Sequence, residues 1–312
     1  MKTITGGCLC GAFSYTLNTD RELASEICAC TDCRRATGGI LTQFYDAHPQ
    51  ELEMSGPLRE YTSSPGVVRT FCETCGTKVY YRMQTDDVYN MHLGTVDDAF
   101  VKHFPLDNVH RISSDSQEYL ARYIDPQVPR YSSNSKERVA FTHGEVHRTP
   151  NRSSVACRCH CGGIDFSIRQ QEVGDMETVM REMALGRAGF QAPDAKKWVA
   201  SVCVCRSCRR AAGRTFESWA FVPTRALSTM NLKTAIYYRS SPDVTRVFCG
   251  TCGATVFWHG DMRKTLIDVA VGLMDDCGRG MLQYPGRISY EEEDPSDLSK
   301  QFLVGLKECD YV

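Results

Sequence analysis

The chain has 312 residues, of which 17 are cysteine, and its 36 basic residues against 38 acidic ones give a net charge of −2. This balance argues against a nucleic-acid partner, no apolar run reaches the roughly 18 residues of a membrane span, and the first residues do not resemble an export signal. We therefore expect a cytoplasmic protein with reduced cysteines, long enough to fold as two domains without disulfides.

Three cysteine groups alternate with short predicted elements in the first half of the chain. A C-x-C pair precedes alternating apolar and polar residues at 12–17, which predict a strand. A C-x-C-x-x-C group runs into a helical turn predicted at 33–38 and ended by glycine. A C-x-x-C pair precedes β-branched and aromatic residues at 77–82, which predict another strand. These cysteines are Cys8 and Cys10, then Cys28, Cys30 and Cys33, then Cys72 and Cys75.

The second half repeats the same groups in the same order. Strands are predicted at 164–168 and 255–258, and a second helical turn at 208–213. Its cysteines are Cys159 and Cys161, then Cys203, Cys205 and Cys208, then Cys249 and Cys252. The chain is therefore interpreted as a tandem duplication of one mostly β unit.

The domain boundaries follow from where the two copies differ. Residues 129–154 are rich in Ser, Asn, Arg and Pro, which predicts a linker between domains at 1–128 and 155–312. Copy two has about 24 additional residues between Cys161 and Cys203, and apolar residues near helical spacing at 172–186 predict an added helix in an insertion at about 170–198. Whether the copies pack as a pseudo-dimer, or the chain self-associates, is left open.

Cysteine spacing favours metal binding over disulfides. A C-x-C pair would close a strained disulfide ring, whereas thiolates on one tight turn converge easily on a metal ion. Zinc is the default metal for such thiolate groups, and an iron–sulfur cluster is the main competitor. Up to four zinc ions are expected per chain.

Seven cysteines per copy divide into four and three. We assign the outer pairs to closed structural sites, Cys8, Cys10, Cys72 and Cys75 in copy one and Cys159, Cys161, Cys249 and Cys252 in copy two. The middle groups, Cys28, Cys30 and Cys33 and then Cys203, Cys205 and Cys208, are predicted to hold zinc with one open position, as catalytic zinc sites do. In the alternative, a histidine such as His48, His92, His103 or His110 closes the site.

Three thiolates leave zinc with excess negative charge, which favours binding an incoming thiol over activating water. The arginines that follow each middle group, Arg34, Arg35, Arg209 and Arg210, are candidates to offset this charge or to bind substrate carboxylates. A solvent-facing helix surface is the alternative. Phe216, Trp219 and Phe221 are candidate pocket walls in copy two, or core residues.

The duplicated pattern resembles the glutathione-dependent formaldehyde-activating enzyme family, also called the centromere protein V/GFA domain. The runs that carry the resemblance are Gly7–Ala12, Cys28–Gly39, Tyr61–Cys72 and Leu93–Asp98, with their counterparts in copy two. The resemblance implies an Mss4-like β fold and a structural and a labile catalytic zinc in each copy. It also implies carbon–sulfur lyase activity that joins glutathione to formaldehyde as S-(hydroxymethyl)glutathione, and a substrate-site histidine at His110.

Three classes of function remain open at this stage. The first is a zinc enzyme that acts on a small-molecule thiol and an electrophile, formaldehyde or a specialised metabolite, with one copy more active than the other. The second is a non-catalytic zinc-binding interaction module. The third is a redox enzyme of the methionine sulfoxide reductase kind, for which Cys157, Cys277 and Cys309 are the remaining thiols.

Overall fold

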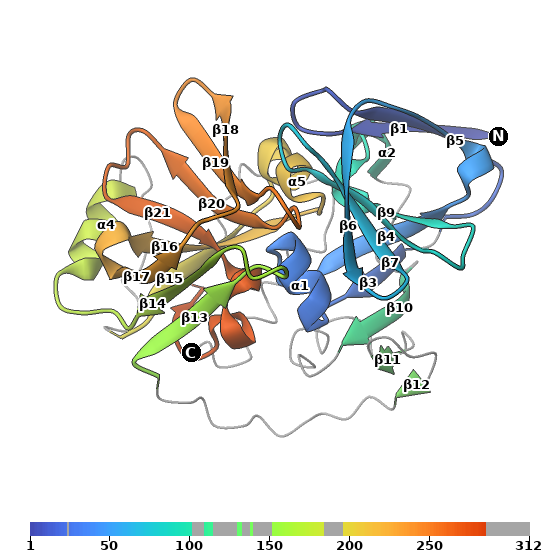
Figure 1. The fold of residues 1–312 in the computed structure, drawn as a ribbon. Coiled ribbons are helices and arrows are strands. Elements are labelled where there is room, and N and C mark those ends of the chain that lie inside the picture. The colour runs from blue at the N-terminus through green and yellow to red at the C-terminus, as the bar shows by residue number, and fades with distance from the viewer. Residues whose placement is uncertain are drawn as a thin grey trace.

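Two β-rich copies lie side by side, copy one in blue and teal and copy two in green to orange, with the short helices α1 and α5 between them (Figure 1). The computed structural model describes residues 1–23, 25–101, 109–114, 130–132, 138–139, 152–183 and 196–284. Strands dominate both copies, as the sequence predicts. Among the helices that these residues form, none is long and apolar enough to cross a membrane.

Copy one consists of a three-stranded and a nine-stranded sheet, in the orders β1-β2-β5 and β12-β11-β10-β3-β4-β9-β8-β7-β6. The strands are β1 (Lys2–Gly7), β2 (Ser14–Thr19), β3 (Ser25–Cys28), β4 (Thr42–Ala47), β5 (Leu52–Ser55), β6 (Leu58–Ser64), β7 (Val67–Cys72), β8 (Lys78–Met83), β9 (Tyr89–His92), β10 (Val109–Ser114), β11 (Arg130–Ser132) and β12 (Arg138–Val139). The α-helices among the described residues of copy one are α1 (Thr31–Thr37) and α2 (Asp98–Val101).

Copy two repeats this topology. Its sheets have the orders β13-β14-β17 and β18-β19-β20-β21-β16-β15-β22, and β22 pairs in parallel with β15 as β10 does with β3. The strands are β13 (Ser154–Arg158), β14 (Asp165–Arg169), β15 (Trp198–Cys203), β16 (Glu217–Pro223), β17 (Leu227–Asn231), β18 (Ala235–Ser241), β19 (Val244–Cys249), β20 (Thr255–Gly260), β21 (Leu266–Ala270) and β22 (Leu282–Gln283). In the part of copy two that the structure describes, the α-helices are α4 (Asp175–Met183) and α5 (Arg206–Ala212).

The predicted elements agree with the structure to within a few residues. The four predicted strands are β2, β8, β14 and β20. The two helical turns are α1 and α5, each of which ends at a glycine in the left-handed conformation, Gly38 with φ 85° and Gly213 with φ 70°. The range 129–154, expected to be a linker, contains β11, β12 and the first residue of β13, and the domain boundaries stay a prediction.

The insertion of copy two contributes the helix α4, as predicted. Asp175 at its first residue is buried and lies 2.6 Å from the guanidinium of Arg169 and 2.7 Å from that of Arg225. At the other end, a carboxylate oxygen of Glu182 accepts a hydrogen bond of 3.1 Å from the backbone N–H of Thr265. These contacts anchor both ends of α4 to copy two, and α4 packs against β16 and β21.

Equivalent residues of the two copies meet at their interface, which therefore has approximate twofold symmetry. Phe71 packs edge-on against its counterpart Phe248, with ring centroids 6.3 Å apart. Lys78 donates a hydrogen bond to its counterpart Thr255. The backbone N–H of Gly272 donates to Gly38 O at 2.9 Å, and that of Gly94 to Gly213 O at 3.1 Å. The loop after each short helix thus pairs with the other copy.

Glycine is required where these loops cross. A Cβ added to Gly94 would lie 2.0 Å from the backbone nitrogen of Arg214, and one added to Gly272 would lie 2.2 Å from the carbonyl oxygen of Gly39. Both neighbours are backbone atoms, so a side chain at either glycine would force the two copies apart.

Candidate metal centres

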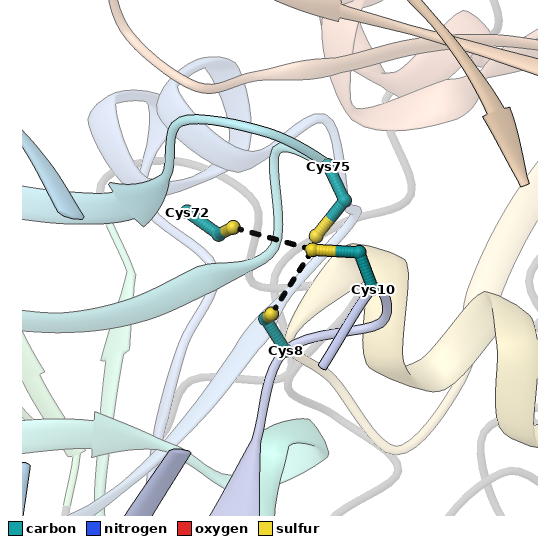
Figure 2. A group of neighbouring side chains, drawn as sticks. All are labelled: Cys8, Cys10, Cys72 and Cys75. Carbon is teal, nitrogen blue, oxygen red and sulfur yellow. Dashed lines mark hydrogen bonds between the residues drawn. The ribbon is translucent and has the colours of Figure 1, made fainter. Parts of the chain in front are cut away.

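Each copy brings its outer cysteines together from the loop after its first strand and the turn after a hairpin strand. Figure 2 shows Cys8, Cys10, Cys72 and Cys75 with their sulfurs facing one another. Cys10 Sγ lies 3.4 Å from Cys8 Sγ and 3.7 Å from Cys72 Sγ. Four sulfurs at a Zn–S distance of about 2.3 Å would lie about 3.8 Å apart in a tetrahedron, so the donor set fits a closed zinc site.

Copy two forms the same group. Cys161 Sγ lies 3.5 Å from both Cys159 Sγ and Cys249 Sγ, and Cys252 completes the set within 4.8 Å. In copy one a hydrogen bond from Cys72 lowers the pKa of Cys75. In copy two a hydrogen bond from Cys159 lowers the pKa of Cys249, and one from Cys252 lowers the pKa of Cys161 to about 7. Each group therefore contains at least one thiol that ionises readily to the thiolate form that zinc binds.

The middle cysteines converge at the N-terminus of a short helix. Cys28 Sγ and Cys30 Sγ are 3.3 Å apart, and Cys203 Sγ and Cys205 Sγ are 3.4 Å apart. Cys30 caps α1 by accepting a hydrogen bond from the backbone N–H three residues later, and Cys205 caps α5 in the same way. Each set of three sulfurs lies within 4.8 Å. We call these sets triad one and triad two.

Readily ionised thiols occur in the triads as well. A hydrogen bond from Cys28 lowers the pKa of Cys33, and one from Cys203 lowers the pKa of Cys205 to about 3. Among the residues that the structure describes, each triad contains three cysteines and no further His, Asp or Glu ligand. The triads thus fit a metal that keeps one position open, the arrangement of catalytic zinc.

An arginine that the sequence analysis did not single out contacts each triad. Arg69 Nη2 lies 3.4 Å from Cys33 Sγ, and the guanidinium of Arg246 lies 3.6 and 3.7 Å from Cys208 Sγ. Both arginines are buried, and each also donates to a serine hydroxyl, Ser63 or Ser240. A positive charge beside three thiolates offsets part of their mutual repulsion. The signal was present in the repeat, because both copies have arginine three residues before the C-x-x-C pair.

A pocket of about 540 Å³ opens on triad two. Its walls include Trp219 and Phe221 from β16, Trp258 from β20, and Met183 at the end of α4. Two of the three predicted aromatic wall residues therefore line the pocket, whereas Phe216 is buried in the core of copy two. The volume lies within the range of sites that bind drug-sized ligands.

Triad one has different surroundings. Its cysteines are 5–7% exposed and form a cluster with Phe44, against which Tyr81 packs. The ring of Phe44 stands edge-on to Tyr81 and to His92, with centroids 4.7 Å away in both cases. In triad two, by contrast, Cys203 and Cys205 are partly exposed.

An acidic side chain lines the pocket of triad two. Asp268 in β21 is 6% exposed and lies 2.9 Å from Arg263, whose guanidinium carbon is 4.4 Å from the centroid of Trp258. Burial raises the pKa of Asp268 to about 6, although the neighbouring Arg263 opposes this. The sequence signal was one carboxylate in the otherwise apolar strand Leu266–Ala270, where the equivalent residue of copy one is Asn90.

The arginines proposed for substrate binding contact protein atoms between the copies. Arg34 lies 3.2 Å from Cys277 Sγ, Arg35 lies 2.5 Å from Asp275, and Arg209 lies 2.8 Å from Asp98. Arg210 donates to two backbone carbonyls at 2.8 Å and pairs with Asp97. Arg34, Arg209 and Arg210 are buried, so a solvent-facing helix surface is the wrong interpretation for them. Their role toward substrate stays a prediction.

The candidate histidines are dispersed. His48 Nδ1 lies 3.2 Å from the carbonyl oxygen of Asp87, and the buried His92 packs against Phe44. His110 lies in β10, at an irregularity in its pairing with β3, and its role stays a prediction. His103 lies outside the described residues.

Each closed cysteine group also has a tyrosine from the other copy as a neighbour. Tyr61 of copy one packs against the core of copy two and accepts or donates a 2.7 Å hydrogen bond with His160 Nδ1. Its counterpart Tyr238 packs against the core of copy one. Burial, together with the cysteines of copy two, raises the pKa of Tyr61 to about 12. The interface thus reaches both closed groups.

Comparison with protein-family models identifies two matching regions. The model of the glutathione-dependent formaldehyde-activating enzyme matches residues 3–110 and again residues 186–288. The chain belongs to this family. A search of curated proteins with this sequence found no match. Two matched regions agree with the tandem duplication, and the family together with the four cysteine groups supports zinc binding.

Proposed function

We propose that this family member catalyses the reversible addition of a thiol to an aldehyde carbon at triad two, a carbon–sulfur lyase activity of the S-(hydroxymethyl)glutathione synthase type. The observation that carries the proposal is a set of three convergent thiols, two of them partly exposed, that opens on a pocket of about 540 Å³. Glutathione is the expected thiol because of the family.

The reaction needs no oxidant or reductant. The thiol loses its proton, its sulfur forms a bond to the aldehyde carbon, and the carbonyl π pair moves to oxygen, which takes up a proton. A zinc ion held by the three cysteines would supply a fourth ligand position, at which the pKa of an external thiol would be lowered.

The side chains around triad two have separate roles in this proposal. Cys203, Cys205 and Cys208 hold the metal, and Arg246 offsets the charge of Cys208. Asp268 lies on the wall of the same pocket and holds the proton in transit between sulfur and oxygen. Trp219 and Trp258 exclude water from the reacting atoms.

The redox class of function fits less well. Cys157 and Cys277 are fully buried, which does not favour redox catalysis by either thiol, and Cys309 lies outside the described residues. A structural zinc role suits triad one, whose cysteines are buried beside Phe44.

The test is exchange NMR with ¹³C-formaldehyde and glutathione, which measures how fast the protein interconverts free and adduct carbon. Cys208→Ser is expected to remove nearly all of the acceleration, and the matched change Cys33→Ser in triad one only a minor part. Equal losses in both variants would contradict the proposal, as would a zinc-loaded wild-type protein that accelerates exchange neither with formaldehyde nor with a larger aldehyde. Circular dichroism of both variants checks that they fold.

A further inference from the structure

The pocket of triad two is much larger than formaldehyde requires. A single water molecule occupies about 30 Å³ of liquid volume, and a one-carbon aldehyde is of similar size. The pocket measures about 540 Å³. Most of it is therefore available for a group attached to the reacting carbon or to the thiol.

The charges on the pocket wall do not suit the peptide part of glutathione. Glutathione has two carboxylates and one ammonium group, whereas the wall carries the three carboxyl groups of Glu182, Asp243 and Asp268. The two arginines of the wall already have partners: Arg246 contacts Cys208, and Arg263 pairs with Asp268. A carboxylate of glutathione could pair with Arg246 or Arg263 only if that arginine gave up its present partner.

Flat apolar surfaces form the remainder of the wall. Trp219 and Phe221 project from β16 and Trp258 from β20, and Met183 and Met262 lie at the same pocket. Arg263 stacks over Trp258 and fixes the orientation of this ring. Aromatic faces and methionine side chains bind planar apolar groups well.

We propose that the pocket of triad two binds the aldehyde-derived part of the adduct, and that this part is a neutral aromatic or conjugated group rather than the single carbon of formaldehyde. The peptide part of the thiol then points out of the pocket. This inference rests on the proposed function, because it assigns a substrate class to the same site. The bonds formed and broken are those of thiol addition to an aldehyde.

The residues around triad one offer a matched comparison. Tyr81 is the counterpart of Trp258, and Phe44 is the counterpart of Trp219. In copy one these rings pack against each other and against the buried cysteines, so they fill the space beside the triad. Tyr81→Leu is thus the control for Trp258→Leu, since each removes one aromatic ring beside a triad.

Kinetics with two aldehydes test the substrate class. Glutathione is combined with 2-naphthaldehyde or with formaldehyde, and kcat/KM is measured for each adduct. We expect the wild-type protein to favour the naphthaldehyde adduct by at least about tenfold, and Trp258→Leu to reduce this ratio by about tenfold. Tyr81→Leu should leave the ratio unchanged. A preference for formaldehyde, or equal effects of the two variants, would overturn the inference but not the proposed function, whereas two inert adducts would overturn both.

Calorimetry gives a second readout that does not depend on turnover. 2-Naphthylmethanol cannot form an adduct, and we expect it to bind the zinc-loaded wild-type protein with one saturable site. Met262 is 74% exposed, so Met262→Glu should fold even where Trp258→Leu does not, and it should weaken this binding about threefold by placing a charge at the pocket. Undetectable binding to the wild-type protein, or unchanged binding to Met262→Glu, would contradict the inference.

Discussion

Triad one and triad two have the same ligands but different environments. Both place three cysteines around a short helix that a cysteine caps, and both have a buried arginine, from β7 in copy one and from β19 in copy two. Phe44 and Tyr81 close over triad one, whereas Trp219 and Trp258 form the wall of a pocket at triad two. The two copies therefore have the same cysteine ligands but differ in how open the metal site is. That openness depends on the surrounding strands and on α4.

The interface between the copies is symmetric in its backbone but not in its charges. Arg214 is the counterpart of Gly39, and a Cβ added to Gly39 would lie 2.2 Å from the guanidinium carbon of Arg214. An identical dimer would carry arginine on both sides of this contact, where only one fits. A duplicated chain can place glycine on one side and arginine on the other, so fusion of the copies allowed an asymmetric interface.

The largest expected difference between the two triads is in how fast they lose zinc to a chelator. The native chain is expected to hold close to four zinc ions. A mild chelator should first remove the ion of triad two, because Cys203 and Cys205 are partly exposed, and should abolish activity without unfolding. The measurements are zinc release with a colorimetric chelator, circular dichroism and adduct exchange. Release from both triads at one rate would show that their different burial has no effect on metal access.

Replacing Asp268 tests whether copy two alone has a proton-transfer residue. Asp268→Asn converts the residue into the one that copy one has at this position, Asn90. We expect kcat to fall about 100-fold with little change in KM, the usual loss for a proton-transfer group. Asp261→Asn is the control, because Asp261 is half exposed and pairs with Arg239 outside the pocket. A change in KM alone would assign Asp268 to binding rather than proton transfer.

Substitution of the interface glycines tests the backbone symmetry. Gly94→Ala and Gly272→Ala each place a Cβ against backbone of the other copy. Each is expected to lower the free energy of unfolding by about 3 kcal/mol, because the copies must move apart. Gly66→Ala is the control: its φ is +77° but no atom lies within 4 Å of the added Cβ, so only backbone strain of about 1 kcal/mol is expected. Denaturant unfolding measures all three.

The smallest expected effect is on the pH dependence of stability, and it comes from the buried Lys78 at the interface between the copies. Burial lowers the pKa of Lys78 from 10.5 to about 7, assisted by Arg214 and opposed by Glu217, Cys252 and Cys75. The folded chain thus binds fewer protons than the unfolded chain between these pH values, and its stability rises with pH. From about pH 7 to about pH 9 this group should add about 2 kcal/mol.

Lys78→Met should remove that pH-dependent increase, whereas Lys233→Met at an exposed position should retain it. Denaturant unfolding of the three proteins at both pH values measures the difference. An increase of the same size in Lys78→Met would show that Lys78 is not its source.

The sequence by itself determined the duplication, the mostly β fold, the two helical turns and the grouping of cysteines into fours and threes. These features depend on local spacing. A C-x-C or C-x-x-C pair lies on one tight turn. A glycine ends a short helix because it adopts a positive φ without steric cost. Trp219 and Phe221 were recognisable as wall candidates because they follow triad two closely in sequence.

Only the tertiary structure decided which triad opens on a pocket and what the paired arginines contact. Arg35 and Asp275 are far apart in sequence, as are Arg210 and Asp97, and these pairs form only when the copies pack together. Asp268 reaches triad two through the order of strands in the sheet. Spacing along the chain determines which cysteines can share a metal, whereas access and charge depend on segments that only packing brings close.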